Sequence, residues 1–311
     1  MAVVGNRHKI GWIGTGRMGF AMAQRLAKES CDLTAYNRTR AKAEPLAKSG
    51  AKLAARPADL AGCDIVFTMV SASDDLKEVV MGKDGVLADK AKQPRILVDC
   101  STVSEEASAE VRAACAQRGT QMLAAPVSGN AKVVKAGKLT IVASGPQDAY
   151  DTVKPYLAMM GRGSSYVGDG ELSRIVKICH NVLLGVTIQN LVEVTILAEK
   201  CGVKRHAFLD FINKSVMGSM FTTYKTPALV NLDMNPTFTP VLLKKDLDLG
   251  LAAARKNNVP MPVTAVTREL VQNLIGLGYA DKDFATLLLQ QARNSGLDIK
   301  SENFEVGDGL S

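Results

Sequence analysis

The chain has 311 residues, 47% of them hydrophobic and 22% charged, which is the composition of a globular protein long enough for two domains. Its apolar runs fall short of the roughly 18 residues that cross a bilayer, and its first residues lack the apolar core of a secretory signal, so we expect a cytoplasmic protein without a membrane partner. The net charge of +7 comes from scattered lysines and arginines without interleaved aromatic residues, so we expect no nucleic-acid partner.

A dinucleotide-binding motif follows the first predicted strand. The apolar run Ile10–Ile13 precedes three glycines spaced as Gly14-x-Gly16-x-x-Gly19, and a helix-prone stretch, Phe20–Lys28, comes next. Gly14 allows a tight turn, Gly16 lets a pyrophosphate approach the backbone, and Gly19 lets the helix pack close to the strand. The free N–H groups at the start of that helix favour a phosphate. A glycine turn without a nucleotide is the alternative interpretation.

The end of the second predicted strand indicates which dinucleotide binds. That strand, Leu33–Tyr36, runs into Asn37-Arg38-Thr39-Arg40, about 20 residues after the glycines. An NAD site usually has an Asp or Glu here to bind the ribose 2′-hydroxyl, whereas an arginine can hold a 2′-phosphate with two hydrogen bonds. We therefore expect NADP(H) in preference to NAD(H). The alternative is that Arg38 and Arg40 are ordinary solvated charges.

Short apolar runs alternate with helix-like stretches through the first part of the chain, which is typical of a parallel sheet covered by helices. We expect a Rossmann-type, doubly wound α/β domain over residues 1–167. Small and polar residues follow several strands, at the sheet edge where such domains bind ligands. The predicted strands are Ile10–Ile13, Leu33–Tyr36, Ile65–Val70, Ile96–Asp99, Gln121–Ala124 and Leu139–Ala143.

The pattern then becomes helical, and we expect an all-helical substrate and oligomerisation domain over residues 168–295. Apolar residues recur at helical spacing through Glu171–Gly202, which predicts one long interdomain helix, ~45 Å in length for about 30 residues. Its few polar residues predict burial, against the core or a second subunit. Residues 296–311 are expected to be a loose tail. The other predicted helices are Arg205–Lys214, Thr223–Leu232, Val241–Asn257, Pro262–Leu277 and Asp283–Gln291, with Asp283 as an N-cap.

The long helix carries the strongest candidates for catalysis. Lys177 and Asn181 are four residues apart and share one helix face. A lysine among apolar neighbours is costly to bury in its charged form, so we expect its pKa to fall toward neutrality. Such a lysine can donate a proton to a carbonyl oxygen during reduction or remove one from an alcohol during oxidation. The alternative is that Lys177 is a surface residue of an amphipathic helix.

Two further segments are candidates for ligand contacts. Ser128-Gly129-Asn130 follows a predicted strand and a proline, and its hydroxyl and backbone N–H groups suit a carboxylate. Lys245, followed by Asp246, could bring a cation to the domain cleft. An ordinary loop and an ordinary charged helix turn are the respective alternatives.

The cysteines form no CxxC pair and no regular framework, so we expect reduced, mostly buried thiols. The three histidines are not spaced as metal ligands, and we expect no metal. The residues concerned are Cys31, Cys63, Cys100, Cys115, Cys179, Cys201, His8, His180 and His206.

Six motifs, taken in order, resemble the β-hydroxyacid dehydrogenase family, which includes 3-hydroxyisobutyrate dehydrogenase, tartronate semialdehyde reductase and glyoxylate/succinic semialdehyde reductase. The resemblance covers Lys9 to Gln291 and extends to a second domain like the C-terminal domain of 6-phosphogluconate dehydrogenase. The motifs are Gly14-Thr15-Gly16-Arg17-Met18-Gly19, Asn37-Arg38-Thr39, Asp99-Cys100-Ser101-Thr102, Ala125-Pro126-Val127-Ser128-Gly129, Lys177-Ile178-Cys179-His180-Asn181 and Lys245-Asp246-Leu247.

The resemblance implies a role for each motif. Lys177 would be the catalytic acid/base, with Asn181 assisting. The substrate carboxylate would be bound by Ser128 and Gly129, with Asn130 and Thr102 beside it. The family also implies a homodimer or homotetramer built through the long helix. The cofactor residues would be Gly14, Thr15, Gly16, Arg17, Met18, Gly19, Asn37, Arg38, Thr39, Met69, Val70, Thr102 near the nicotinamide, and Lys245.

The chain departs from the family in the substrate loop. The family usually has Asp at position 124, where this chain has Ala124, and a second glycine at position 130, where it has Asn130. A usual Gly-Ala pair is replaced by Val133-Val134. The loop is therefore bulkier, and the identity of the substrate does not transfer from the relatives.

The sequence thus predicts an NADP-dependent oxidoreductase that interconverts a small β-hydroxy acid, or a related short hydroxy acid, with its aldehyde or ketone. An imine reductase of the same fold is one alternative, but such enzymes tend to have Asp or Tyr where this chain has Lys177. A catalytically inactive binding module is another, but relatives of that kind lose the lysine.

Overall fold

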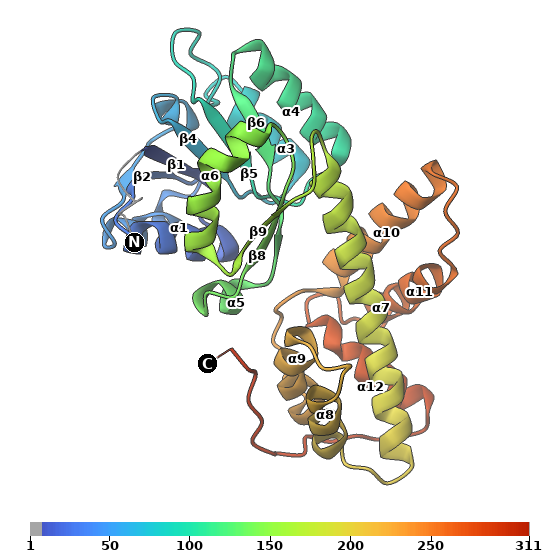
Figure 1. Cartoon of the computed structure of the whole chain (residues 1–311). Coiled ribbons are helices and arrows are strands. Elements are labelled where there is room, and N and C mark those ends of the chain that lie inside the picture. The colour runs from blue at the N-terminus through green and yellow to red at the C-terminus, as the bar shows by residue number, and fades with distance from the viewer. Residues whose placement is uncertain (1–7, 311) are drawn as a thin grey trace. The chain divides into compact units, whose positions relative to one another are not determined.

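The computed structural model describes residues 8–310 (Figure 1). They form two compact units, one ending at Lys177 and the other beginning at Ile178. The boundary falls inside the long helix α7 (Leu172–Lys200), whereas the sequence places the domain boundary at residues 167 and 168. The first turn of α7 belongs to the first unit because Ser173 and Arg174 bond to its strand ends.

The first unit is built on a six-stranded parallel sheet with the strand order β3-β2-β1-β4-β5-β6. From β1 the chain adds β2 and β3 on one side, and it then crosses over to add β4, β5 and β6 on the other side. Ligands of doubly wound folds bind at such a reversal of strand order, here between β1 and β4. The strands are β1 (Lys9–Ile13), β2 (Asp32–Tyr36), β3 (Lys52–Leu53), β4 (Ile65–Thr68), β5 (Ile96–Asp99) and β6 (Gln121–Ala124).

Two apolar cores cover the opposite faces of this sheet. Trp12 and Phe67 point into the core under one set of helices, while Ile13 and Val66 point into the core under the other. Successive strand residues face opposite ways, so each strand contributes to both layers. This confirms the doubly wound fold. Helices α1 (Arg17–Lys28), α5 (Ala131–Lys135) and α6 (Gln147–Met160) cover the first face, and α3 (Ser73–Met81) and α4 (Glu105–Gln117) the second; the short α2 (Glu44–Ala47) precedes β3.

A second, three-stranded sheet corrects one sequence prediction. Leu139–Ala143 is expected in the main sheet, but its strand β8 (Thr140–Ala143) pairs antiparallel with β7 (Val127–Ser128) and parallel with β9 (Gly163–Tyr166). The main sheet instead has β3 as its outer strand. Both β3 and β7 have two residues, and β9 reads Gly-Ser-Ser-Tyr, so none carries the apolar alternation that identifies a strand.

The second unit is all helical, as the sequence predicts. Helices α7 and α10 approach closely at two glycines: a Cβ on Gly250 would lie 2.3 Å from Val182, and one on Gly185 would lie 3.0 Å from Leu247. Ser219 caps α9 by accepting a hydrogen bond from Thr222, which starts that helix before the predicted Thr223. The helices after α7 are α8 (Arg205–Lys214), α9 (Met220–Asn231), α10 (Pro240–Lys256), α11 (Pro262–Gly276) and α12 (Leu287–Asn294).

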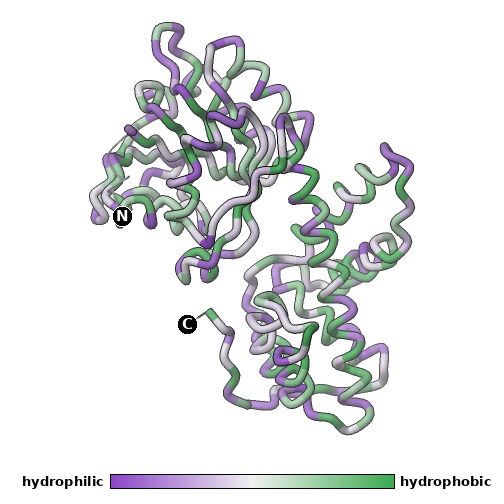
Figure 2. Tube along the Cα trace, in the orientation of Figure 1, coloured by the Kyte–Doolittle hydropathy of each residue, from purple (hydrophilic) through white to green (hydrophobic). Residues whose placement is uncertain are grey.

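Helix α7 has the length and composition of a membrane span. Its most apolar 18 residues have a mean hydropathy of 1.5, although polar residues interrupt the apolar ones. Half of that window is buried within the protein. Figure 2 shows the helix as mostly green with several purple turns.

The C-terminal segment is tied down rather than loose in its described part. Glu302 accepts hydrogen bonds from the backbone N–H groups of Arg205 and His206 at 2.8 and 2.9 Å. The ring of Phe304 stacks on His206 with centroids 3.9 Å apart. These contacts hold the segment against α8. They are not evident from the polar composition of the segment, because the partner residues are nearly 100 positions away in the sequence.

The six cysteines differ in exposure. Cys31, Cys100 and Cys115 are buried, whereas Cys179 and Cys201 are exposed. "Mostly buried" is therefore wrong for the set, because the long helix carries Cys179 on an outward position and Cys201 just beyond its end. All six are free thiols.

A buried ion pair in the second unit predicts that the stability of the fold decreases at acidic pH. Lys225 Nζ lies 2.6 Å from Asp283 Oδ1. Burial raises the pKa of Asp283, but Lys225 and hydrogen bonds from Ala285 and Thr237 outweigh it, so the pKa lies below its ordinary 3.8. Such a carboxylate stabilises the fold above the unfolded-state pKa, and the stabilisation is lost as the pH falls through the folded-state pKa.

We therefore expect the urea midpoint of the wild type to fall between about pH 5 and pH 3, and to fall less steeply over that range in Asp283→Asn. Urea unfolding followed by circular dichroism at both pH values measures the two slopes. Equal slopes in the two proteins would contradict the assignment.

Candidate dinucleotide site and catalytic residues

The glycine turn after β1 has the geometry that the sequence predicts. Gly14 has φ of +94°, and a Cβ there would lie 2.2 Å from the carbonyl oxygen of Met69. A Cβ on Gly19 would lie 2.0 Å from the carbonyl oxygen of Gly14. Gly16 differs from both, because no described atom lies within 4 Å of its Cβ position. The first and third glycines are thus required by the fold, and the second leaves open space.

The open space lies at the N-terminus of α1. Gly16 is the N-cap, and no side chain of the described residues caps the helix or places an acid in its first turn, Arg17-Met18-Gly19. The hydroxyl of Thr15 is buried without a hydrogen-bond partner among the described residues. Free backbone donors, the helix dipole and an orphaned hydroxyl together fit a phosphate group.

Asn37 connects the end of β2 to the glycine turn. Its Oδ1 accepts a hydrogen bond from Thr15 N at 2.8 Å, and its Nδ2 donates to the carbonyl oxygen of Thr39 at 2.9 Å. The neighbouring Arg38 side chain is 85% exposed and its Nη1 lies 3.0 Å from Asp75 Oδ1. Asp75 lies in the first turn of α3, and the sequence offers no signal that it meets Arg38.

The loops after β4 and β5 are bonded to each other. Val70 N donates to Ser101 Oγ at 2.9 Å, and Ser101 Oγ donates to Asp99 Oδ1 at 2.7 Å. Met69 and Val70 are half-buried on the first loop, and Thr102 is half-buried on the second. Three of the predicted cofactor contacts, Met69, Val70 and Thr102, therefore lie on two loops that are hydrogen-bonded to each other.

The predicted substrate loop begins in β7 and ends at α5. Ser128 is half-buried, and Gly129 is exposed with φ of +138°. A Cβ on Gly129 would lie 2.8 Å from the side chain of Val133. Val133, which is bulkier than the usual family residue, therefore leaves room only for glycine at position 129. Asn130 Oδ1 accepts a hydrogen bond from Val133 N at 3.1 Å and caps α5. The side-chain oxygen of Asn130 is therefore already bonded to the helix.

The two predicted catalytic residues lie one helical turn apart on α7. Lys177 is half-buried at the end of the first unit. In the second unit, Asn181 is buried and its Nδ2 donates to Asp246 Oδ2 at 2.6 Å. The exposed Lys245 places its Nζ 3.2 Å from Asp246 Oδ1. Sequence reasoning assigns Lys245 a role but misses that its neighbour Asp246 orients Asn181.

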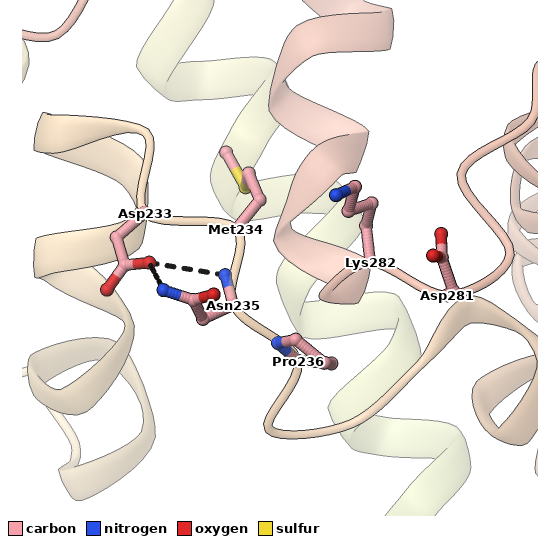
Figure 3. Close-up of a pocket in the computed structure, with 6 residues that line it drawn as sticks. All are labelled: Asp233, Met234, Asn235, Pro236, Asp281 and Lys282. Atoms are coloured by element: carbon pink, nitrogen blue, oxygen red, sulfur yellow. Dashed lines mark hydrogen bonds between the residues drawn. The ribbon is translucent and has the colours of Figure 1, made fainter.

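A pocket of about 410 Å³ lies elsewhere in the second unit (Figure 3). Asp233 Oδ1 there accepts two hydrogen bonds from Asn235, so these two lining residues bond to each other. None of the predicted catalytic or cofactor residues lines it. Its residues are Asp233, Met234, Asn235, Pro236, Asp281 and Lys282.

Comparisons with known proteins agree with this geometry. Residues 9–168 match the NAD binding domain of 6-phosphogluconate dehydrogenase, and residues 172–290 match the NAD-binding domain of NADP-dependent 3-hydroxyisobutyrate dehydrogenase. The 2-(hydroxymethyl)glutarate dehydrogenase of Eubacterium barkeri is 30% identical over 94% of this chain and 97% of its own length.

Two further relatives extend the comparison. The cytokine-like nuclear factor N-PAC of Xenopus tropicalis is 31% identical over 90% of this chain, which spans 52% of that protein. The crystal structure of 3-hydroxyisobutyrate dehydrogenase from Salmonella typhimurium superposes with a TM-score of 0.80 at 25% identity, covering 90% of this chain and 99% of that one. With its glycine turn, strand order and helical second unit, the chain belongs to the β-hydroxyacid dehydrogenase family of pyridine-nucleotide-dependent oxidoreductases.

Proposed function

We propose that this protein uses NADP(H) to interconvert a short β-hydroxy acid, or a related short hydroxy acid, and its semialdehyde or keto form, with Lys177 as the general acid/base. One observation carries the proposal. The first turn of α7 bonds to the ends of β5 and β6, through Arg174 to Asp99 and through Ser173 Oγ to the carbonyl oxygen of Ala124. Lys177 follows Arg174 by three residues in the same helix, and we infer that it lies at the edge of the sheet at which the glycine turn also lies.

The chain's own residues would divide the reaction between them. When bound, the nicotinamide supplies or accepts the hydride. In the reducing direction the Lys177 ammonium would donate a proton to the carbonyl oxygen of the substrate, and solvent would then reprotonate the amine. The Ser128 hydroxyl and the Gly129 N–H would bind the substrate carboxylate. Asn181, oriented by Asp246, would assist Lys177 from the next turn.

A substrate panel tests the proposal. NADPH oxidation is measured with succinic semialdehyde, glyoxylate and the semialdehydes of 3-hydroxyisobutyrate and 2-(hydroxymethyl)glutarate, with a cyclic imine as the competing substrate. The proposal requires turnover of at least one carboxylate-bearing aldehyde. Turnover of the imine alone would favour an imine reductase, and no turnover with intact DNA or nucleosome binding would favour a binding module. Lys177 argues against both alternatives.

NADP(H) is the proposed cofactor because Arg38 can bind a 2′-phosphate in place of Asp75. We expect Arg38→Asp to lower the ratio of kcat/KM for NADPH to that for NADH by about 100-fold, enough to invert the preference, because a guanidinium is exchanged for a repelling carboxylate. Steady-state kinetics with both cofactors measure this ratio.

Two matched variants control that experiment. Lys48→Asp makes the same charge change at another exposed position of the first unit and should leave the ratio unchanged. Asp75→Asn removes the competing carboxylate and should lower KM for NADPH by no more than about fivefold, because exposed ion pairs are weak. NADPH kinetics that are unaltered in Arg38→Asp would refute the cofactor assignment.

We also propose a cytoplasmic homodimer or homotetramer. Leu183 and Leu197 of α7 are 66% and 63% exposed, and burial of these two apolar side chains against a second copy would remove them from water. Light scattering coupled to size-exclusion chromatography should give two or four times the 33.1 kDa chain mass, and a monomeric mass would exclude this assembly.

A further inference from the structure

A buried charge cluster surrounds the first turn of α7 and is not explained by folding alone. Arg174 is 2% exposed and Asp99 is fully buried. Arg174 Nη2 donates to Asp99 Oδ2 at 2.5 Å, and its Nη1 donates to the carbonyl oxygen of Ser101 at 2.5 Å. Its Nε donates to Ser108 Oγ at 3.2 Å. All three donor nitrogens of this guanidinium are therefore engaged in different directions.

A second arginine, Arg112, bonds to the residues just before the same turn. Glu171 Oε1 accepts from Arg112 Nε at 2.6 Å, and Glu171 Oε2 lies 3.7 Å from Arg174 Nε. Arg112 also donates to the carbonyl oxygens of Gly170 and Met122. The start of α7 is thus tied to β6 and α4 as well as to β5.

Asp99 links this turn to the predicted cofactor loops. Its Oδ1 accepts from Thr68 Oγ1 at 2.6 Å and from Ser101 Oγ at 2.7 Å, and the same Ser101 oxygen accepts from Val70 N. One carboxylate therefore holds the ends of β4 and β5 with one oxygen and the start of α7 with the other. Lys177 follows Arg174 by three residues and lies on the same helix face.

Buried ion pairs are an inefficient way to stabilise a fold, because desolvation offsets much of the attraction and apolar side chains of similar volume do as well. They do fix geometry, since a planar guanidinium bonded in three directions has one orientation. A general acid gains from such fixing, because a displacement of about 1 Å can cost about 100-fold in rate.

We propose that Arg174 is a positioning residue that acts through Lys177, holding its amine in register with the loops of Val70 and Thr102 by means of Asp99. The inference rests on the proposed function and adds a residue outside the six family motifs. It predicts that loss of the Arg174–Asp99 bond slows the chemical step without weakening cofactor binding.

A matched control pairs with the other end of α7. Arg205, the first residue of α8, is 1% exposed, donates to the carbonyl oxygens of Leu229 and Val230, and pairs with Glu199 of α7 at 2.5 Å. It has the same chemistry and burial as Arg174, but its partner on α7 is at the opposite end of that helix from Lys177. A purely structural role predicts equal consequences for Arg174→Lys and Arg205→Lys.

The experiment compares Arg174→Lys, Asp99→Asn and Arg205→Lys in the full chain. Asp99→Asn weakens the same ion pair from its other partner, so the inference does not depend on one variant folding. We expect the melting temperature to fall by about 5–10 °C in all three. We expect kcat to fall by about 10–100-fold in the first two, with the NADPH Kd from fluorescence titration and the KM for the aldehyde within about threefold of wild type. Arg205→Lys should keep the wild-type kcat.

A double variant shows whether Arg174 acts through the lysine. In a Lys177→Ala background, Arg174→Lys should lower kcat by less than about twofold, because the group that it positions is gone. Additive losses, a wild-type kcat in Arg174→Lys, or an equal loss in Arg205→Lys would overturn the inference. A wild-type protein that turns over no aldehyde of the panel would instead refute the proposed function, and this inference with it.

Discussion

Replacing Lys177 by alanine is expected to lower kcat by about 10²–10⁴-fold, the usual contribution of a general acid/base. The carbonyl oxygen would then have to take its proton from water while the hydride is transferred. The NADPH Kd should change little, because the predicted cofactor contacts lie on the loops after β1, β2, β4 and β5 and on Lys245. Steady-state kinetics and fluorescence titration measure the two quantities separately.

Lys200 provides the control for this variant. It lies at the other end of α7 and donates to the carbonyl oxygen of Ser295 at 2.8 Å. Lys200→Ala makes the same substitution in the same helix and should keep the wild-type kcat. Full activity in Lys177→Ala, or a comparable loss in Lys200→Ala, would remove the proposed mechanism.

The glycine turn predicts opposite outcomes for two alanine variants. Gly16→Ala should leave the ligand-free protein folded, with stability within about 1 kcal/mol of wild type, because the Cβ meets no described atom within 4 Å and φ is −66°. It should weaken NADPH binding by about 10–100-fold, because a methyl group would occupy the space that the pyrophosphate requires.

Gly19→Ala should instead destabilise the protein before any cofactor binds. Its Cβ would lie 2.0 Å from the carbonyl oxygen of Gly14, so α1 must move away from β1, at a cost of about 1–3 kcal/mol or more. Urea unfolding and NADPH titration on both variants separate the effects. Unaltered NADPH affinity in Gly16→Ala would mean that the dinucleotide does not pass over this turn.

The parts that the sequence predicts well are those in which neighbouring residues carry the signal. The glycine turn and its flanking strand and helix lie within twenty residues, and Arg205–Lys214 matches α8 at both ends. Asp283 is an N-cap, as expected, and accepts from Ala285 N at 2.9 Å, but it caps a 3-10 turn (Phe284–Thr286) that precedes α12. In each case a local rule of backbone geometry or capping determines the structure.

The parts that it misses depend on residues distant in sequence. Asp99 and Arg174 are 75 positions apart in the sequence. Arg38 is 37 positions from Asp75, and Asn181 is 65 positions from Asp246. Taken alone, each of these residues looks like an ordinary charged or polar position. Leu139–Ala143 has a correct strand pattern, but nothing local shows which sheet it joins.

The substrate loop lies between these extremes. Gly129 and Asn130 are recognisable as a turn and a helix start, and the structure shows why Val133 makes the loop tight. Selection of one hydroxy acid over another depends on how well the side chains of this loop fit the size of the substrate, and the sequence does not encode that size in a local pattern. The class of reaction therefore follows from the sequence more directly than the substrate does.

Transfer of deuterium from the cofactor to the substrate carbon tests the central claim most directly. NADPH carrying deuterium at both hydrogen positions of nicotinamide C4 is incubated with the aldehyde that gives the highest turnover, and the product is examined by mass spectrometry. The account predicts one deuterium on the carbon that bore the carbonyl oxygen, at a rate that falls with Lys177→Ala. Product without deuterium, or labelled product formed equally fast by Lys177→Ala, would contradict it.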